Sequence, residues 1–198
     1  MAQREAQIRA AHPRLAPLLL ALSSASPRQS AFERGARGER AVAATLERRV
    51  AAGSVRLLHD RRMPRGQGNI DHLAIAATGV YVIDAKAHKG KVRIARPRFG
   101  SERLLINGRD WTRLLDGLDR QVEVVRHVLS GIDSIEIPIH GALCFTNADL
   151  PWLSTARMRG HLLIYGRALA RRLNAAGPLP PTIVDSLTRT LAATLPPA

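Results

Sequence analysis

The chain has 198 residues, of which 45% are hydrophobic, and a formal net charge of +14. This hydrophobic share excludes an intrinsically disordered chain, and the length is sufficient for one ordinary domain with a buried core. The positive charge favours a polyanionic partner, most simply nucleic acid, although charge alone does not distinguish such a partner from a generally basic surface.

The cysteine content excludes a chain held together by internal disulfides, and the short apolar runs exclude a helix that spans a membrane. Cys144 is the single cysteine and lies in an apolar run, so we expect a buried small side chain and no disulfide within the chain. No apolar run approaches the length that crosses a bilayer. The basic, leucine-rich start loosely resembles a signal peptide, but Glu5 and Pro17 interrupt that pattern. We therefore expect a cytoplasmic protein without a membrane partner.

The N-terminal part divides into an extension and the first helix of a domain. Residues 1–30 are expected to form a helical extension and a linker, and residues 31–198 a single domain. A helix is predicted over residues 32–50 from an apolar stripe at helical spacing. Glu39 falls on that stripe, where a carboxylate either binds a partner or cation, or benefits from the dipole at the helix start.

A hairpin with charged ends follows a first strand at 55–59 and an arginine-containing loop at 61–68. Residues 69–86 read as two apolar strands joined by a turn at 77–79. In this register Asp71 lies opposite Asp84, and Lys86 shares the face of Asp84. Opposed carboxylates repel each other unless something lies between them, and magnesium prefers carboxylate oxygens. The alternative is a strand end where Lys86 neutralises two surface acids.

The rest of the chain alternates strands and helices. A basic turn is expected at 87–91, where His88, Lys89 and Lys91 would either grip a phosphate or be solvated. Gln121 interrupts the apolar stripe of the second long helix and therefore needs hydrogen-bond partners. The remaining predicted elements are a hairpin at 92–95 and 103–106, a turn at 107–108, the helix at 114–129, strands at 139–145 and 161–165, and helices at 167–175 and 181–195.

The order of these elements resembles the core of the PD-(D/E)XK nuclease superfamily and, more narrowly, the nuclease-related domain, NERD. The resemblance covers about residues 32–150, leaving 151–198 as a C-terminal strand and helices. The strings that carry it are Gly38-Glu39, Ile70-Asp71-His72, the strand 79–86 ending in Asp84-Ala85-Lys86, Arg120-Gln121, and the strand 138–145. It implies an α/β fold, a restriction-endonuclease-like three-layer sandwich with a mixed central sheet flanked by helices.

The resemblance also implies an activity, which is magnesium-dependent hydrolysis of DNA in processing or repair, with manganese as an alternative ion. Glu39, Asp71 and Asp84 would be the acidic, metal-binding set. Lys86 would be the catalytic lysine, and Gln121 a supporting polar residue. The sequence departs from the family pattern at Asp84, where glutamate is usual, and at Ala87, where asparagine is frequent.

Two other functions compete with the nuclease. A degenerate nuclease fold could bind nucleic acid without cleaving it, and the basic charge fits both readings. A protein-interaction module could dock a partner through its terminal helices, for which the leucine-rich N-terminal segment is the support. The intact set of two acids and a lysine favours the enzyme.

Overall fold

The computed structural model describes residues 27–64, 68–132, 136–150 and 156–198. The chain divides into two compact units, Met1–Ala36 and Arg37–Ala198. Of the first unit, only the beginning of helix α3 (Pro27–Arg49) is described. The predicted N-terminal extension therefore lies outside the described residues, apart from residues 27–30. These four residues are helical and not a linker, because proline is well tolerated in the first helical turn.

A mixed sheet of eight strands forms the centre of the second unit. The strand order is β1-β2-β3-β6-β8-β7, and β4 and β5 extend from the far part of β3. Strand β6 runs parallel to both β3 and β8, and the other pairs are antiparallel. The strands are β1 (Arg56–Arg62), β2 (Asn69–Ala76), β3 (Gly79–Ala95), β4 (Arg103–Ile106), β5 (Arg109–Asp110), β6 (Ile139–Asp149), β7 (Ala156–Met158) and β8 (His161–Tyr165).

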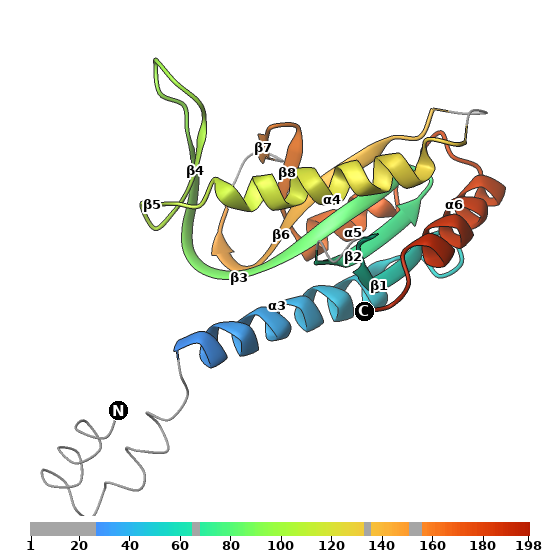
Figure 1. The fold of residues 1–198 in the computed structure, drawn as a ribbon, viewed down its shortest axis with the longest axis horizontal. Coiled ribbons are helices and arrows are strands. Elements are labelled where there is room, and N and C mark those ends of the chain that lie inside the picture. Colours follow the sequence, from blue (N-terminus) through green and yellow to red (C-terminus); the bar gives the residue numbers. More distant parts are fainter. Residues whose placement is uncertain (1–26, 65–67, 133–135, 151–155) are drawn as a thin grey trace, which may run out of the picture. The chain divides into compact units, whose positions relative to one another are not determined.

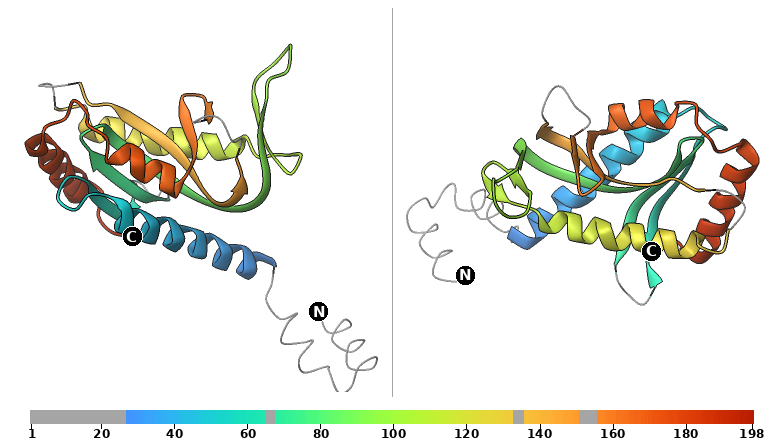
Figure 2. Two further views of the ribbon diagram at one scale, coloured as in Figure 1. Left: turned by 180° about the vertical axis from the view of Figure 1, so that it is seen from behind. Right: turned by 90° about the horizontal axis from the view of Figure 1, so that it is seen from above.

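Helices cover both faces of the sheet, which confirms the predicted α/β sandwich. On one face, α4 (Arg113–Leu129) and α6 (Pro181–Thr194) bury a core with Leu73, Val82 and Leu143. On the other, α5 (Gly166–Leu173) and the described part of α3 within the second unit bury a core with Tyr81 and Ile83. Figures 1 and 2 show the resulting layers of the second unit. Both faces must be covered because the central strands are apolar on both sides.

The β2–β3 hairpin has the predicted register. Leu73 pairs with Val82 and Ile75 with Val80, across a two-residue turn at Ala77–Thr78. Gly79 has φ +128°, and a Cβ at this position would lie 2.3 Å from the carbonyl oxygen of Pro138. A glycine is therefore required where the hairpin meets the loop that leads into β6.

Strands extend into two predicted loops, over Arg61 and Arg62 in the first and over the whole of residues 87–91 in the second. Strand β1 continues through Arg61 and Arg62, and the Arg61 side chain is buried and donates to the carbonyl oxygen of Leu195 at 2.8 Å. It is thus neither solvated nor available to a phosphate. The basic turn predicted at 87–91 is also wrong, because β3 continues to Ala95 with only a local irregularity between Lys86 and Lys89. Pairing with β6 on one side holds this polar segment extended, although its own pattern resembles a turn.

The other predicted helices and strands are confirmed within a few residues of their expected ends. The stripe of α4 is buried, and Cys144 is fully buried in β6, where burial raises the pKa of its thiol to about 12. Strand β7 was not predicted, because its three residues are too few to establish a pattern. Among the described residues, no helix is long and apolar enough to cross a membrane.

Candidate functional site

The candidate site lies where β2 and β3 separate. Their pairing ends at His72 and Ile83, one residue before Asp71 would face Asp84. Beyond that point a side chain, and not the backbone of β2, accepts the next hydrogen bond from β3. The Oδ2 of Asp71 accepts it from the backbone N–H of Ala85 at 2.8 Å. Asp71 and Asp84 therefore lie close together, as the register predicted. The contact at the end of the β2–β3 pairing is made by the Asp71 carboxylate and not by a backbone carbonyl.

Lys86 lies directly against Asp84. Its ammonium donates a very short hydrogen bond to Asp84 Oδ1, and the side chains of Lys86 and Asp84 are only 19% and 9% exposed. A pair so far removed from water interacts strongly and is costly to break from one side. This ion pair is the neutralising contact that the sequence offered as an alternative to a metal site, and it places an ammonium at the acids.

Asp71 is the perturbed member of the site. Burial, together with the nearby carboxylates of Asp84 and Glu39, raises the pKa of Asp71 from 3.8 to about 7, although the Ala85 N–H and Lys86 act in the opposite direction. An acid with such a pKa exchanges its proton near neutral pH, as general acids and bases in active sites do.

This pKa predicts how stability depends on pH when no divalent cation is present. Because the folded-state pKa of Asp71 lies above its ordinary value, the contribution is complete below about pH 4 and is lost as the pH rises through about 7. Between pH 5 and pH 8, the free energy of unfolding of the wild type should fall by roughly 2 kcal/mol relative to Asp71→Asn, whose amide does not titrate. Urea denaturation in the presence of a chelator measures this difference.

The matched control for that measurement is Glu123→Gln, which removes an exposed carboxylate of α4 paired with Arg126. Its unfolding free energy should keep a constant offset from that of the wild type over the same range. If Asp71→Asn also kept a constant offset, Asp71 would titrate as an ordinary solvated aspartate, and its place in the site would be lost.

Glu39 reaches the site because α3 packs closely on β3. A Cβ on Gly38 would lie 2.8 Å from the Cβ of Ala87, so only glycine allows this approach without displacement. Glu39 is half-buried, and its carboxylate is one of the charges that raise the pKa of Asp71. The small side chain of Ala87 therefore matches the close approach of Gly38.

Gln121 links α4 to the same strand end. Its Nε2 donates to the backbone carbonyl of Asn69 at 3.2 Å, two residues before Asp71 on β2. Its Oε1 is buried and has no hydrogen-bond partner among the described residues. Gln121 thus anchors the beginning of β2 with one end of its amide and leaves an acceptor oxygen available with the other.

His88 was expected in a basic turn, but the structure places it beside the site. Its ring contacts the Trp111 ring edge-on, with centroids 4.3 Å apart, and burial and the Lys86 ammonium lower the pKa of His88. This contact could not be predicted, because it depends on the continuation of β3 past Lys86. His72 is buried, with its Nδ1 2.9 Å from the Nδ1 of His59.

The acids are grouped, but they do not form a complete cage. Within the described residues, no three His, Cys, Asp or Glu side chains are close enough together to hold a metal ion between them. What the structure does bring together is the pair of aspartates, Asp71 and Asp84, with the ammonium of Lys86. Glu39 adds to the charge there from α3, and Gln121 secures the adjacent strand end.

Comparisons with known proteins identify the same region. The family model of the nuclease-related domain, NERD, matches residues 34–146, more than half of the chain and close to the expected 32–150. A search of curated proteins and a search of solved structures each gave no match. The mixed sheet flanked by helices is consistent with the restriction-endonuclease-like fold of the PD-(D/E)XK superfamily. The chain belongs to the nuclease-related domain family.

Proposed function

We propose that the chain is a metal-dependent nuclease that hydrolyses phosphodiester bonds of DNA, in processing or repair. The observation that carries the proposal is the meeting of Asp71, Asp84 and Lys86 where β2 and β3 separate. A binding module has little use for carboxylates at the place where a phosphate would approach, because like charges repel. A cytoplasmic location belongs to the same proposal.

Magnesium is the proposed cofactor, with manganese as an alternative. Carboxylate oxygens are the hard ligands that these ions prefer, and the two aspartates supply them. Gln121, whose buried Oε1 has no partner among the described residues, lies at the adjacent start of β2. Asp71 and Asp84 would hold the ion, and Glu39 would support it. The bound ion would neutralise phosphate charge and lower the pKa of a coordinated water.

The protein groups have separate tasks in this proposal. Lys86 carries its ammonium beside Asp84, where it can donate to a phosphate oxygen and stabilise the charge that develops during attack. The raised pKa of Asp71 belongs to the chain without a cation, and a bound cation would favour the ionised carboxylate that holds it. Gln121 holds the backbone at Asn69, so that β2 presents Asp71 in one position.

One observation favours a second candidate, nucleic-acid binding without cleavage. Lys86 is already paired with Asp84, and a structural ion pair of this kind requires no catalytic role. The two readings predict the same basic surface, so binding measurements alone do not separate them.

A cleavage assay tests the proposal. Single-stranded, duplex and circular DNA, and single-stranded RNA, are incubated with the full chain and magnesium, manganese or a chelator. The expected result is cleavage of DNA that requires a divalent ion and is absent in Asp71→Asn. If none of these nucleic acids is cut with either ion, the binding-only function becomes the better description.

A further inference from the structure

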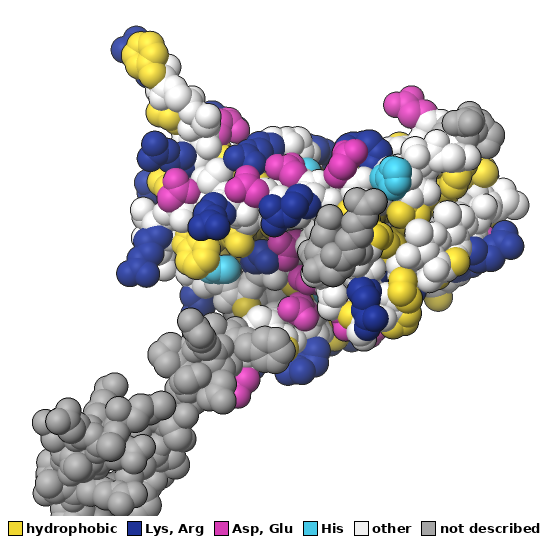
Figure 3. Space-filling view, viewed as in Figure 1, with side chains coloured by type: hydrophobic (Ala, Val, Ile, Leu, Met, Phe, Trp, Pro, Cys, Tyr) yellow, Lys and Arg dark blue, Asp and Glu magenta, His cyan; other side chains and the backbone are white. Residues whose placement is uncertain are grey.

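A basic arm extends from the strand that carries the site. We define it as residues 89–110, which comprise the far part of β3, the loop that follows, β4 and β5. Seven of its residues are Lys or Arg and two are Asp or Glu. Its net charge is therefore +5, compared with +14 for the whole chain. Figure 1 shows the arm standing away from the layered body of the second unit, and Figure 3 shows Lys and Arg side chains at its tip and around its base.

The cations of the arm face solvent because of strand alternation. Val92, Leu104 and Ile106 are buried, whereas Lys91 and Arg93 point to the opposite side and are exposed. Side chains at positions i and i+2 of a strand lie about 6.6 Å apart on one face, so these residues form a row. The exposed cations are Lys89, Lys91, Arg93, Arg96, Arg98, Arg103 and Arg109.

Most of this charge is not neutralised by the protein itself. Among the described residues, the only ion pair of the arm joins Arg96 to Glu102, at 2.6 Å. The carboxylate of Asp110 accepts hydrogen bonds from Thr112 at the base of the arm. The remaining cations repel one another unless a polyanion lies along them, which is the complementarity expected of a nucleic-acid backbone.

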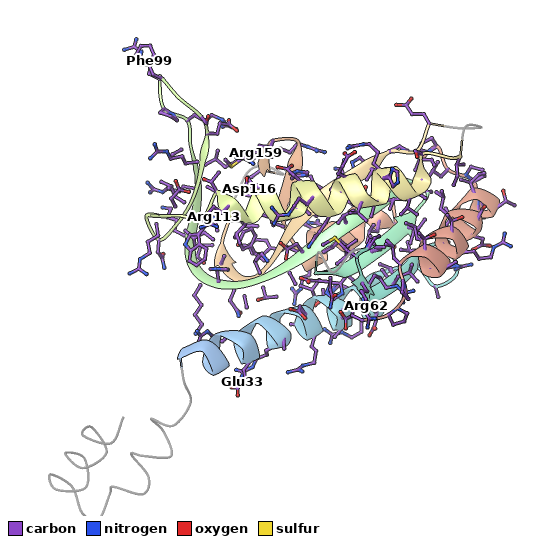
Figure 4. All side chains as sticks on the ribbon, in the orientation of Figure 1. Glu33, Arg62, Phe99, Arg113, Asp116 and Arg159 are labelled. Carbon is purple, nitrogen blue, oxygen red and sulfur yellow. The ribbon has the colours of Figure 1, made fainter. Side chains whose placement is uncertain are left out.

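The tip of the arm presents an aromatic side chain to solvent. Phe99 is 90% exposed and lies at the end of the arm, as Figure 4 shows. It follows Arg98 and precedes Gly100, whose φ of +96° turns the chain back toward β4. Exposed phenylalanine contributes nothing to the core, and an aromatic ring among cations is the combination that stacks on bases whose phosphates are also held.

We propose that the basic arm binds nucleic acid at an unpaired segment, with the cations on the phosphates and Phe99 stacked on a base. A single protruding ring needs a free base face, and a strand with unpaired bases offers such faces, whereas an intact duplex keeps them covered. The inference rests on the proposed function only in its choice of nucleic acid as the partner. It names the form of the substrate, which the site does not.

The shared strand sets the distance between arm and site. Lys89, where the arm begins, lies five positions after Asp84 and Val92 lies eight, which correspond to about 16 and about 26 Å of fully extended chain. The arm would therefore hold the nucleic acid several nucleotides away from the scissile bond and would orient the strand without contacting the reacting atoms.

The test is equilibrium binding of the full chain to fluorescent oligonucleotides in a chelator, which removes cleavage from the measurement. A single strand, a blunt duplex of the same sequence, and a duplex with an unpaired overhang are compared. Phe99→Ala should weaken binding to the single strand and the overhang about tenfold, and to the blunt duplex less than about twofold. Phe99→Trp should restore binding, and a 2-aminopurine base should show a stacking signal that Phe99→Ala removes.

A charge variant tests the other half of the arm. Lys91→Gln, Arg93→Gln and Arg98→Gln combined should weaken binding to all three nucleic acids and reduce the slope of log affinity against log salt by roughly two to three. The matched control is Arg189→Gln, an exposed arginine of α6, which should leave both quantities nearly unchanged.

The outcomes separate the arm from the nuclease. Unchanged binding in Phe99→Ala and in the charge variant would overturn the arm proposal, even if the wild type cleaves DNA. Equal loss of binding to blunt duplex and single strand in Phe99→Ala would overturn the unpaired-base assignment. If the arm variants lose binding as expected but the wild type cleaves nothing, the arm proposal stands and the proposed nuclease activity fails.

Discussion

Replacing Lys86 with alanine is expected to slow DNA cleavage by roughly 10²-fold or more, because a positioned electrostatic or acid–base group contributes about that much to a rate. Metal binding should persist, since both aspartates remain. Affinity for DNA should fall only slightly, because one phosphate contact among many is lost. Single-turnover cleavage rates, measured beside metal titration and DNA binding, test all three expectations.

Arg189→Ala is the control for that variant, since it removes an exposed cation of α6 that belongs to neither the site nor the arm. Its cleavage rate at saturating protein should stay close to that of the wild type. If Lys86 only neutralises Asp84, the results change in a defined way. Cleavage by Lys86→Ala would then continue at the wild-type rate. A lower melting temperature without metal is expected under either reading, because Asp84 loses its ion-pair partner.

Replacing Asp84 with alanine is expected to abolish binding of magnesium and manganese and to reduce cleavage by roughly 10³-fold, because metal assistance supplies several kcal/mol of stabilisation. Calorimetric titration of the ion and a single-turnover rate measure the two effects. Asp84→Asn should behave similarly, because it keeps the shape of the side chain and removes only its charge.

Asp149→Ala is the control for the loss of an aspartate. This residue ends β6 and is the strand-register partner of Lys91 on β3, away from the separation of β2 and β3. It should bind the ion as the wild type does. Unchanged ion binding in both Asp84 variants would place the metal elsewhere, and the acidic site would then be a structural ion pair.

The sequence was sufficient to predict the central hairpin and its charged end. The register follows from the position of the two-residue turn, so the pairing of Leu73 with Val82 led directly to the meeting of Asp71 and Asp84. The buried stripe of α4 followed from helical spacing, which also singled out Gln121 as a polar interruption. These patterns are local, and the tertiary structure reinforces them.

Features that depend on contacts between distant segments could not be predicted. Residues 87–91 look like a basic turn until β6 pairs with them, and this pairing creates the long strand that becomes the arm. The carboxylate of Asp71 accepts from Ala85 only because β2 leaves β3 there. The burial of Arg61 depends on carbonyl oxygens of α6 and its end, more than 100 positions away in sequence. No periodicity in the chain records these contacts.

Because β3 is one extended strand, insertions and deletions in its far part should involve an even number of residues. From Lys89 to Ala95, consecutive side chains alternate between solvent and the covered side, in register with β4 for the last four residues. Gain or loss of one residue there would turn the cationic row inward and expose Val92, whereas a change of two would restore each side chain to its face. Insertions and deletions tolerated in this segment should therefore come in pairs, and the arm can lengthen only in steps that keep its charges in water.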